Sequence, residues 1–541
     1  MDVKISKVPG DQPARSDCSA AQVPMSLTDV PSVSLAQVAD ILGSDSIYRG
    51  TQAIEQVHFR GAVGDNRKVR ASNLFLAMPG AHVHGMAFAS QALKSGAACL
   101  ATTPSGWEQY GETLPEETPV VISENLPKRA GEISALAWGH PFRRLRNFGV
   151  TGTNGKTTTT FMISHILRAL GHKTGLMGTV CVDIDGHAQP AELTTPQPWD
   201  VQGIGALMVD RGIQDCVMEV SSHALTLGRV RPLVFDVAAF SNLTQDHLDF
   251  HSDMEDYFLA KAKLFKAENS RTQVVLIDNP WGLRLAKELG NFPHVHTLSL
   301  TGGQARWQGQ FNVEKDSAEG GATLTLKQSD NPAEELRVYI GLPGVFNVEN
   351  AALALVSVLA AGHTIPEISQ ALGPRFMPEI PGRMELVGSA PRVVVDFAHN
   401  PDGLEQALSS LQKITEGKLI VVFGATGERD RDKRPKMARI VAAYADAVFV
   451  TDDDPHEEDP AQIRAEVMAG FDNEPEGYAI NVDDRAKAID WAIKLAKAQD
   501  TVLVAGRGHE SHQALGRAMI EMDDRVLCRE ALRRHHGGGA Q

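Results

Sequence analysis

The sequence predicts an α/β protein of three domains, in which a small α/β unit precedes two domains built on parallel sheets. Three observations predict this fold class: a length of 541 residues, a phosphate-binding run that follows a short β-favouring stretch, and strand and helix patterns that alternate from residue 148 onward. Domains usually contain about 100–200 residues, so the chain has room for three. We expect a flexible tail at 1–31, an α/β domain at 32–145, a central P-loop domain at 146–380 and a Rossmann-like domain at 381–541.

The composition is that of an ordinary globular protein, with 43% hydrophobic and 22% charged residues. The 67 acidic residues exceed the 52 basic ones, a net charge of −15 that disfavours a nucleic-acid partner. Five scattered cysteines without a CxxC pair argue against a disulfide framework and a zinc cluster, and favour a reducing cytoplasm. No apolar run reaches the roughly 20 residues that span a bilayer, and the N-terminus lacks a signal-peptide pattern, so we expect no membrane insertion.

The first domain shows a mixed pattern between Ser34 and Pro141. Periodicity and end signals predict a helix at Leu35–Leu42, a strand at Leu74–Ala77 and a helix at Ala87–Lys94 that ends at Gly96. The end of the chain, from Arg533 through a histidine pair and three glycines, has the composition of a loose terminus, as does the N-terminal tail.

Strands and helices alternate in the second and third domains, which predicts doubly wound parallel sheets. In the second we expect helices at 161–170 and 257–265 and strands at 148–150, 215–220 and 237–240. In the third, after the punctuation of Pro378 and Pro381, we expect strands at 393–397, 419–423, 447–450 and 502–505.

The run from Val150 to Thr160 is typical of a loop that holds the phosphates of a nucleotide. Gly152 and Gly155 let backbone amides turn inward, Lys156 can neutralise phosphate charge, and the Thr157 hydroxyl can bind Mg²⁺ where the helix starts. The general P-loop pattern has a glycine at the position of Val150, so the spacing is a variant.

Polar clusters follow the predicted strands, at the sheet edge where ligands of parallel sheets bind. Glu219 ends one strand and is placed to bind Mg²⁺. His247 offers an imidazole to a second metal ion or to a phosphate. Lys261 falls on an amphipathic helix, where spacing alone places a lysine on the solvated face.

Taken together, several runs resemble the Mur ligases of peptidoglycan synthesis. They are 152–158, 219–223, 242–249, 344–350, 381–385 and 396–401, and the resemblance covers most of the chain from Ser34. Within that family the chain is most similar to the branch that adds the third residue of the stem peptide, because the segments around Asp65 and Gly506 match that branch.

The resemblance implies a cytoplasmic, monomeric, ATP- and Mg²⁺-dependent acid–amino-acid ligase that joins a diamino acid to UDP-MurNAc-L-Ala-D-Glu through an acyl phosphate. It also implies a carbamylated Lys261, which contradicts the spacing argument, and it makes Lys156, Lys261 and His247 the catalytic residues.

The same resemblance implies the residues that contact each ligand. ATP would contact Gly152, Thr153, Asn154, Gly155, Lys156, Thr157, Thr158, Asn347 and Arg383. Mg²⁺ would contact Thr157, Glu219, His247 and Lys261. The muramyl substrate would contact Asn66, Thr194, Thr195, Ser221 and Arg229, although Asn66 stands where the family usually has serine and Leu227 where it often has glutamine.

The amino acid would bind Arg429, Asp453, Asp454, Pro455, His456, Gly506 and Glu510 by the same resemblance. Members that use meso-diaminopimelate carry Asp-Asn-Pro-Arg, whose arginine clamps the distal carboxylate, and this chain has His456 at that place. Carboxylates follow at 457–459 and favour a bare ammonium group. We therefore expect L-lysine or ornithine; the alternative is meso-diaminopimelate with a clamp from Arg431 or Arg507.

Two further hypotheses are kept: another ligase of the same superfamily, and a non-catalytic nucleotide-binding module or P-loop kinase. A related ligase of the superfamily, such as a folylpolyglutamate synthetase or the enzyme that adds D-Ala-D-Ala, would differ at the Asp65 and Gly506 segments. A non-catalytic nucleotide-binding module would be expected to lose Lys156, Glu219, His247 or Lys261, and all four are present. A P-loop kinase would have no use for the third domain.

Overall fold

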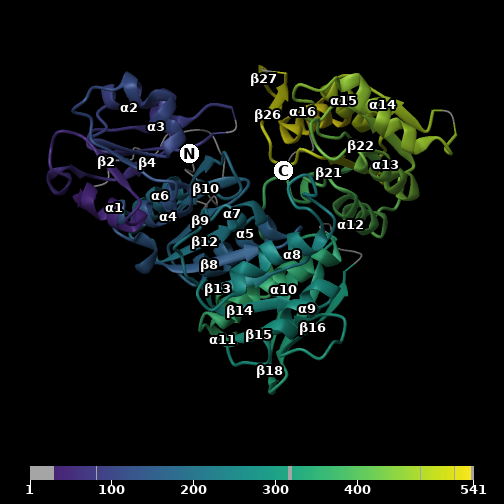
Figure 1. Ribbon diagram of the computed structural model, residues 1–541. Coiled ribbons are helices and arrows are strands. Elements are labelled where there is room, and N and C mark those ends of the chain that lie inside the picture. The colour runs from purple at the N-terminus through teal and green to yellow at the C-terminus, as the bar shows by residue number, and fades with distance from the viewer. Residues whose placement is uncertain (1–29, 81, 315–319, 476, 517, 538–541) are drawn as a thin grey trace, which may run out of the picture.

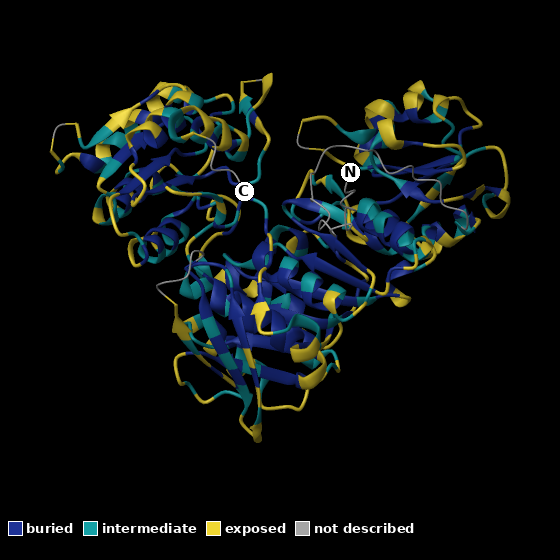
Figure 2. Ribbon diagram, turned by 180° about the vertical axis from the view of Figure 1, so that it is seen from behind, coloured by how far each residue is buried: buried dark blue, intermediate teal, exposed yellow. Residues whose placement is uncertain are grey.

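The computed structural model describes residues 30–80, 82–314, 320–475, 477–516 and 518–537. The chain forms three lobes, with the N-terminal and C-terminal lobes side by side above the central one (Figure 1). In each lobe the inner strands of the sheet are buried and the outer surfaces of the helices are exposed (Figure 2). The tail predicted at 1–31 lies almost entirely outside the described residues.

The N-terminal lobe contains a five-stranded sheet of order β2-β7-β6-β5-β4. Its strands are β2 (Ile47–Arg49), β4 (Ala62–Val63), β5 (Leu74–Ala77), β6 (Cys99–Thr102) and β7 (Val120–Ile122), and β1 (Val33–Ser34) pairs separately with β3 (His58–Phe59). Helices α1 (Leu35–Leu42) and α4 (Leu126–Ala137) contribute to one apolar core. Helix α2 (Ala89–Lys94) contributes to a second core, against which α3 (Pro104–Tyr110) packs. The predicted bounds of α1 and β5 are confirmed. The helix predicted at Ala87–Lys94 begins as a 3₁₀ turn, η3 (Gly85–Phe88).

The central lobe is built on a mixed sheet of twelve strands, in the order β11-β10-β9-β12-β8-β13-β14-β15-β16-β17-β18-β19. The parallel part comprises β9 (Thr174–Met177), β12 (Asp215–Glu219), β8 (Arg146–Thr151), β13 (Phe235–Phe240), β14 (Ser270–Leu276), β15 (Val295–Ser299) and β16 (Trp307–Val313). Antiparallel strands extend it at both ends: β10 (Cys181–Ile184) and β11 (His187–Pro190) on one side, β17 (Ala322–Gln328) and β18 (Asn331–Ile340) on the other, where β19 (Arg375–Phe376) pairs with β18.

Each face of this sheet has its own apolar core. One core includes side chains of α5 (Lys156–Ala169), α10 (Val345–Ala360) and α11 (Ile365–Leu372). The other includes α6 (Pro198–Asp210), α8 (Met254–Ala262) and α9 (Pro280–Leu289), while the short α7 (Ser222–Thr226) follows β12. The expectation of a purely parallel sheet is therefore incomplete, because β10–β11 and β16–β18 add antiparallel hairpins.

The C-terminal lobe is a six-stranded sheet of order β20-β21-β25-β22-β23-β24, parallel except at the β20 edge. Its strands are β20 (Glu385–Ser389), β21 (Arg392–Asp396), β22 (Leu419–Phe423), β23 (Ala447–Val450), β24 (Ala479–Asn481) and β25 (Thr501–Ala505). On one face pack α12 (Pro401–Gln412), α13 (Lys433–Tyr444) and α14 (Pro460–Met468), and on the other α15 (Arg485–Leu495) and α16 (Asp524–His536). A separate hairpin, β26 (His512–Leu515) and β27 (Ala518–Glu521), lies between β25 and α16 in the chain.

The loose terminus expected from Arg533 onward is wrong up to residue 536. These residues form the last turn of α16, where His535 Nε2 lies 2.9 Å from an Asp490 carboxylate oxygen and His536 Nε2 lies 2.9 Å from the Ile493 carbonyl. Composition cannot show such tertiary contacts. Among the described residues, none of the helices has the length and apolar character needed to cross a membrane.

Candidate active site

The phosphate cradle forms where β8 ends and α5 begins. Gly152 and Gly155 have φ of 153° and 85°, and a Cβ at position 155 would overlap the Asn350 side chain. Gly155 is the N-cap of α5 and no side chain caps it, so the first amides of the helix are free to bind an anion. Val150 lies within β8, fully buried in the core, which explains why this position holds an apolar residue instead of glycine.

Lys156 lies across this cradle. Its Nζ donates to the carbonyls of Gly152, at 3.0 Å, and of Thr153, at 2.8 Å. Burial lowers the pKa of Lys156, and the negative charge of Glu219 and Asp246 opposes that effect. The ammonium group therefore lies at the mouth of the loop, where a phosphate would meet it.

Glu219 and Thr157 form a pair of oxygen ligands beside the cradle. The Thr157 hydroxyl donates to Glu219 Oε2 at 3.0 Å, and the fully buried carboxylate also accepts hydrogen bonds from the Thr179 amide and hydroxyl at 2.8 and 2.9 Å. Two adjacent hard oxygens at the start of a P-loop helix are the ligands that Mg²⁺ prefers. The residues present therefore fit this metal ion.

Lys261 is buried, which corrects the spacing argument that placed it on a solvated helix face. It is 1% exposed, because this side of α8 packs against the cradle, and its Nζ donates to the Gly152 carbonyl at 2.8 Å and lies 4.5 Å from the centre of the Tyr257 ring. Burial, with the like charge of Lys156, holds its pKa well below the usual value. A buried lysine of lowered pKa has the neutral amine that reacts with CO₂.

His247 follows Asp246 and has a backbone conformation that is uncommon for a residue other than glycine, with φ of 54°. Its Nε2 is 3.9 Å from Asp246 Oδ2, and burial lowers its pKa to about 4. The imidazole is therefore neutral at pH 7 and keeps a lone pair for a metal ion or a hydrogen bond.

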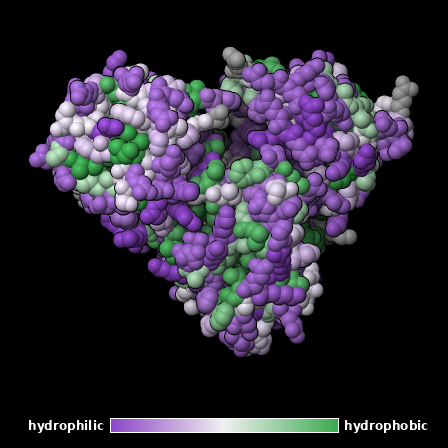
Figure 3. Space-filling view, viewed as in Figure 1, coloured by the Kyte–Doolittle hydropathy of each residue, from purple (hydrophilic) through white to green (hydrophobic). Residues whose placement is uncertain are grey.

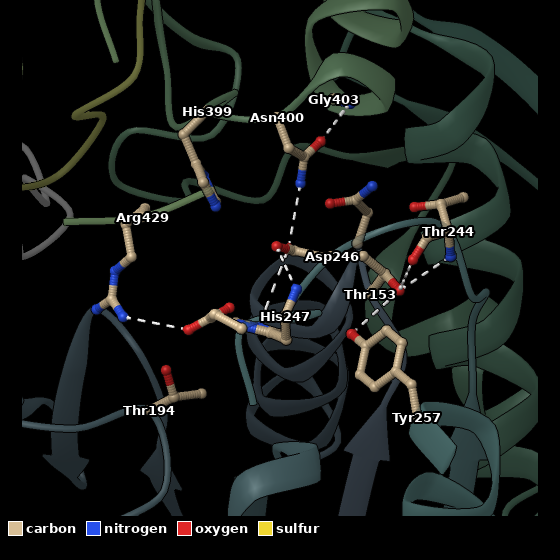
Figure 4. A network of polar contacts seen from close by, with 12 residues as sticks. Thr153, Thr194, Thr244, Asp246, His247, Tyr257, His399, Asn400, Gly403 and Arg429 are labelled. Carbon is tan, nitrogen blue, oxygen red and sulfur yellow. Dashed lines mark hydrogen bonds and ion pairs between the residues drawn. The ribbon is translucent and has the colours of Figure 1, made fainter. Parts of the chain in front are cut away.

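The C-terminal lobe reaches this site with residues that follow β21 and β22. Asn154 of the cradle donates to Asp402 Oδ2 at 2.6 Å, Asn400 Nδ2 lies 3.5 Å from Asp246 Oδ2, and an Arg429 nitrogen lies 3.8 Å from an Asp249 carboxylate oxygen. Figure 4 shows the side chains of His399, Asn400 and Arg429 directed toward the loop that contains Asp246 and His247. In the space-filling view a hollow lies between the two upper lobes (Figure 3).

A cavity between the cradle and the C-terminal lobe brings together several predicted nucleotide contacts. Its lining includes Asn154, Gly155, Thr158, Asn347 and Arg383. The half-buried Arg383 guanidinium lies 4.3 Å from the centre of the Phe397 ring and donates to the Thr157 hydroxyl at 3.2 Å, whereas Asn347 Nδ2 donates to the Pro343 carbonyl at 2.8 Å. Thr153 faces away from this cavity, because its hydroxyl contacts the Thr244 carbonyl and the Tyr257 hydroxyl.

The residues expected at the muramyl substrate form one cluster and one separate position. The Thr195 hydroxyl donates to the Glu219 carbonyl at 2.8 Å and to Ser221 Oγ at 3.3 Å, Arg229 donates to the Thr195 carbonyl at 3.2 Å, and Thr194 accepts from Thr179 at 3.1 Å. Asn66 lies in the N-terminal lobe on the short 3₁₀ turn η2 (Asn66–Lys68), where its Nδ2 donates to Gln91.

The predicted amino-acid contacts include three converging carboxylates. Ligand atoms of Asp453, Asp454 and Glu510 lie within 4.8 Å of one another, and Gly506, with φ of 113°, leaves room for the Asp453 carboxylate beside it. Asp453 is buried and its Oδ2 has no hydrogen-bond partner among the described residues. Burial and the neighbouring Asp453 raise the pKa of Glu510 to about 8. This group of atoms suits an ammonium ion.

The expectation that carboxylates at 457–459 would select a bare ammonium is wrong for two of the three. Glu458 accepts hydrogen bonds from the buried Arg434 at 2.8 Å and pairs with Arg431 at 2.8 Å. Asp459 caps α14 through the Ala461 amide. Both groups already have partners, which the sequence could not show because those partners lie elsewhere in the lobe.

The two alternative clamps are also committed to protein partners. Arg431 pairs with Glu458, and the fully buried Arg507 pairs with Asp454 and donates to the His512 carbonyl at 2.5 Å. His456 has φ of 53°, and its backbone bonds the β26–β27 hairpin through the Ala514 carbonyl and the Gly516 amide. His456, which is half-buried, therefore lies against that hairpin, two residues after Asp454 of the carboxylate cluster.

Three residues that sequence reasoning did not assign complete the site: Asp246, Thr179 and Asp402. Asp402 gave the best signal, because Asn400-Pro401-Asp402 begins a helix directly after a strand and so places its carboxylate at the sheet edge. Thr179 gave none, because its partner Glu219 lies 40 residues away.

Comparison with known protein families gives matches over most of the chain. Residues 57–141 match the model described as Mur ligase family, catalytic domain; residues 150–358 match the Mur ligase middle domain; and residues 382–508 match the model described as Mur ligase, glutamate ligase domain.

Curated relatives match at full length. The chain is 40% identical to a protein of Streptomyces avermitilis over 94% of this chain and 98% of the relative, and 41% identical to a protein of Synechococcus elongatus over 89% and 97%. Both are named UDP-N-acetylmuramoyl-L-alanyl-D-glutamate–2,6-diaminopimelate ligase. A solved structure of a ligase with that name is 29% identical, with a TM-score of 0.62 over 94% of this chain and 100% of the other.

Proposed function

The chain belongs to the Mur ligase family, and from this premise we propose that it uses ATP to add the third residue of the stem peptide to UDP-MurNAc-L-Ala-D-Glu in peptidoglycan synthesis. The observation that carries the proposal is the meeting of two sheet edges. The cradle of the central lobe faces the C-terminal lobe, whose Asn400 and Asp402 contact Asp246 and Asn154. A site that holds a nucleotide beside an ammonium-binding pocket suits an ATP-driven amide ligation.

The reaction proceeds in two transfers. A carboxylate oxygen of the D-glutamate attacks the γ-phosphorus, the bond to the β-phosphate oxygen breaks, and ADP leaves. The amine nitrogen of the incoming amino acid then attacks the acyl carbon, the bond to phosphate breaks, and the nitrogen loses a proton. A carboxylate is a poor acyl donor until phosphate becomes its leaving group, which is why the ligation consumes ATP.

The side chains of the site have separate tasks in these transfers. Lys156 and the free amides at the start of α5 hold the triphosphate and offset its charge. Mg²⁺, which Thr157, Glu219, His247 and a carbamylated Lys261 would hold, supplies further positive charge for the transferring phosphoryl group. Ser221, Thr195 and Arg229 position the muramyl dipeptide, and Asp453 with Glu510 holds an ammonium group of the incoming amino acid.

We favour 2,6-diaminopimelate as that amino acid, which replaces our expectation of lysine. The two curated relatives cited above carry this substrate in their names. Part of the argument for lysine is also lost, since Glu458 and Asp459 have protein partners. L-lysine or ornithine stays as a second candidate because His456 stands where an arginine clamp is expected.

A phosphate-release assay tests the proposal. The full chain would be incubated with ATP, Mg²⁺ and UDP-MurNAc-L-Ala-D-Glu, and with meso-diaminopimelate, L-lysine or ornithine in turn. We expect phosphate release and a new UDP-linked tripeptide, detected by mass spectrometry, with meso-diaminopimelate. Product with lysine or ornithine alone would establish the second candidate, and phosphate release with none of the three would reject the ligase.

A further inference from the structure

Glu349 is an acidic side chain in the nucleotide cavity for which the described residues provide no hydrogen-bond or salt-bridge partner. It lies near the start of α10 and lines the cavity together with Gly155 and Thr158 of the cradle and Gly403 and Gln406 of α12. The side chain is half-buried. It has no role in the phosphate chemistry described above.

Two other carboxylates lie near Glu349, and both accept hydrogen bonds from protein donors. Asp402 Oδ2 accepts hydrogen bonds from Asn154 at 2.6 Å and Gln406 at 3.0 Å. Asp278, which follows β14, accepts from Ser299 at 2.5 Å and from the Leu300 amide at 2.6 Å. Burial together with these two negative charges raises the pKa of Glu349 to about 7. Ionised Glu349 thus lacks the hydrogen-bond donors that stabilise its neighbours.

The direction of the bound nucleotide follows from the cradle. The phosphates occupy the end formed by Gly155 and Lys156, so the nucleoside extends into the remaining cavity, between α10 and α12. A carboxylate beside the triphosphate would repel it. The nucleoside half is uncharged and carries N–H and O–H donors on the adenine amine and the ribose hydroxyls.

We propose that Glu349 is a specificity-determining residue for the nucleotide, its carboxylate accepting a hydrogen bond from a donor of the nucleoside half of ATP. The inference takes from the proposed function only that ATP is the nucleotide. A hydrogen bond to a charged acceptor discriminates against an analogue that lacks the donor, because the half-buried carboxylate is then left unpaired.

Equilibrium binding to the full chain tests the role of Glu349, with Mg²⁺ and neither muramyl substrate nor amino acid present. The ligands are ATP, inosine triphosphate, in which a carbonyl replaces the amine, and the 2′-deoxy and 3′-deoxy forms of ATP. We expect the unmodified protein to prefer ATP over one of these analogues by about ten- to one-hundredfold. Glu349→Ala should abolish that preference, and Glu349→Gln, whose amide oxygen still accepts, should reduce it partly.

Glu405→Ala is the matched control, since it removes an exposed carboxylate from the neighbouring helix α12. Loss of discrimination against inosine triphosphate identifies the adenine amine as the donor, and loss against a deoxy form identifies the corresponding hydroxyl; either supports the proposal. An equal loss of affinity for all four ligands, or no change, overturns it. If Glu349→Ala does not fold, as judged by thermal melting, Glu349→Gln gives the same test.

Failure of the proposed function is distinguishable from failure of this inference. Binding is measured without ligation, so a protein that discriminates through Glu349 but forms no tripeptide would reject the ligase and keep the nucleotide contact. A protein that forms the tripeptide while Glu349→Ala leaves discrimination intact would do the reverse.

Discussion

The nucleotide cradle and the amino-acid pocket are held together in different ways. The cradle is one short run, 150–160, whose geometry comes from two glycines and the start of a helix. The pocket is assembled from three segments of the C-terminal lobe, and its charges are fixed by ion pairs such as that of Asp454 with Arg507. A site encoded by local backbone geometry can be read from sequence. A site that depends on which acid pairs with which base cannot.

The largest expected effect tests the lysine behind the cradle. Lys261→Ala should lower kcat by about a thousandfold, because it removes the group proposed to hold a metal ion at the transferring phosphate. Bicarbonate should restore activity to unmodified protein prepared without CO₂ but leave Lys261→Ala inactive, as a phosphate-release assay would show. Lys263→Ala, two residues further along and half-exposed, is the control. Full activity of Lys261→Ala would show that this lysine only packs against the loop.

The next effect tests whether glycine geometry defines the cradle. Gly155→Ala should lower kcat/KM for ATP by about a hundredfold, since a Cβ there would overlap Asn350 and move the loop away from the phosphates. Gly171→Ala is the control, because its φ of 86° is similar but a Cβ would meet nothing within 4 Å. Similar losses in both variants would mean that backbone strain, and not the contact in the cradle, is responsible.

Loss of an ion pair in the amino-acid pocket should lower the stability of the C-terminal lobe. Asp454→Ala removes the nearer of the two carboxylates beside the fully buried Arg507 and leaves Glu510 at 3.8 Å, which should cost the C-terminal lobe about 3 kcal/mol in free energy of unfolding. Amide hydrogen exchange in β22 and β25 would measure it. Asp454→Asn keeps an acceptor for Arg507 and should cost less, and Arg507→Met added to Asp454→Ala should recover part of the loss. Unchanged exchange would show that Asp454 contributes to substrate binding alone.

This contrast also shows how far the sequence could predict the molecule. The strands Leu419–Phe423 and Ala447–Val450 have the predicted bounds, because continuous apolar runs in a parallel sheet give a strong pattern. The antiparallel strand Asn331–Ile340 and the hairpin at 512–521 were missed, since most of their residues are polar or exposed. The cradle residues were assigned correctly as a loop and helix start. The partners of Glu458 and Arg507 were not predicted, because an ion pair between residues far apart in the sequence leaves no local signal.

A smaller effect concerns the residue that separates the two amino-acid candidates. His456→Arg should raise kcat/KM for meso-diaminopimelate relative to L-lysine by about tenfold, because a guanidinium fork binds the distal carboxylate in two places. Competition between the two amino acids, followed by mass spectrometry of the tripeptide, measures the ratio. His512→Arg, an exposed position on the adjoining hairpin, is the control. An unchanged ratio would show that the distal carboxylate binds elsewhere.

The smallest effect is a pH-dependent difference in stability between Glu349→Gln and the unmodified protein. The pKa of Glu349 is raised from its usual 4.5 to about 7 in the folded chain, so between these values the folded chain holds this proton more tightly than the unfolded one. Ionisation of Glu349 therefore removes stability as the pH rises from about 4.5 to 7, and Glu349→Gln, which cannot ionise, escapes that loss. The melting temperature of Glu349→Gln minus that of the unmodified protein should rise by about 2 °C between pH 5 and pH 8. Saturating ATP should shrink this difference, since the nucleoside would supply the missing donor; a difference that ATP leaves unchanged would mean that the nucleoside gives the carboxylate no hydrogen bond.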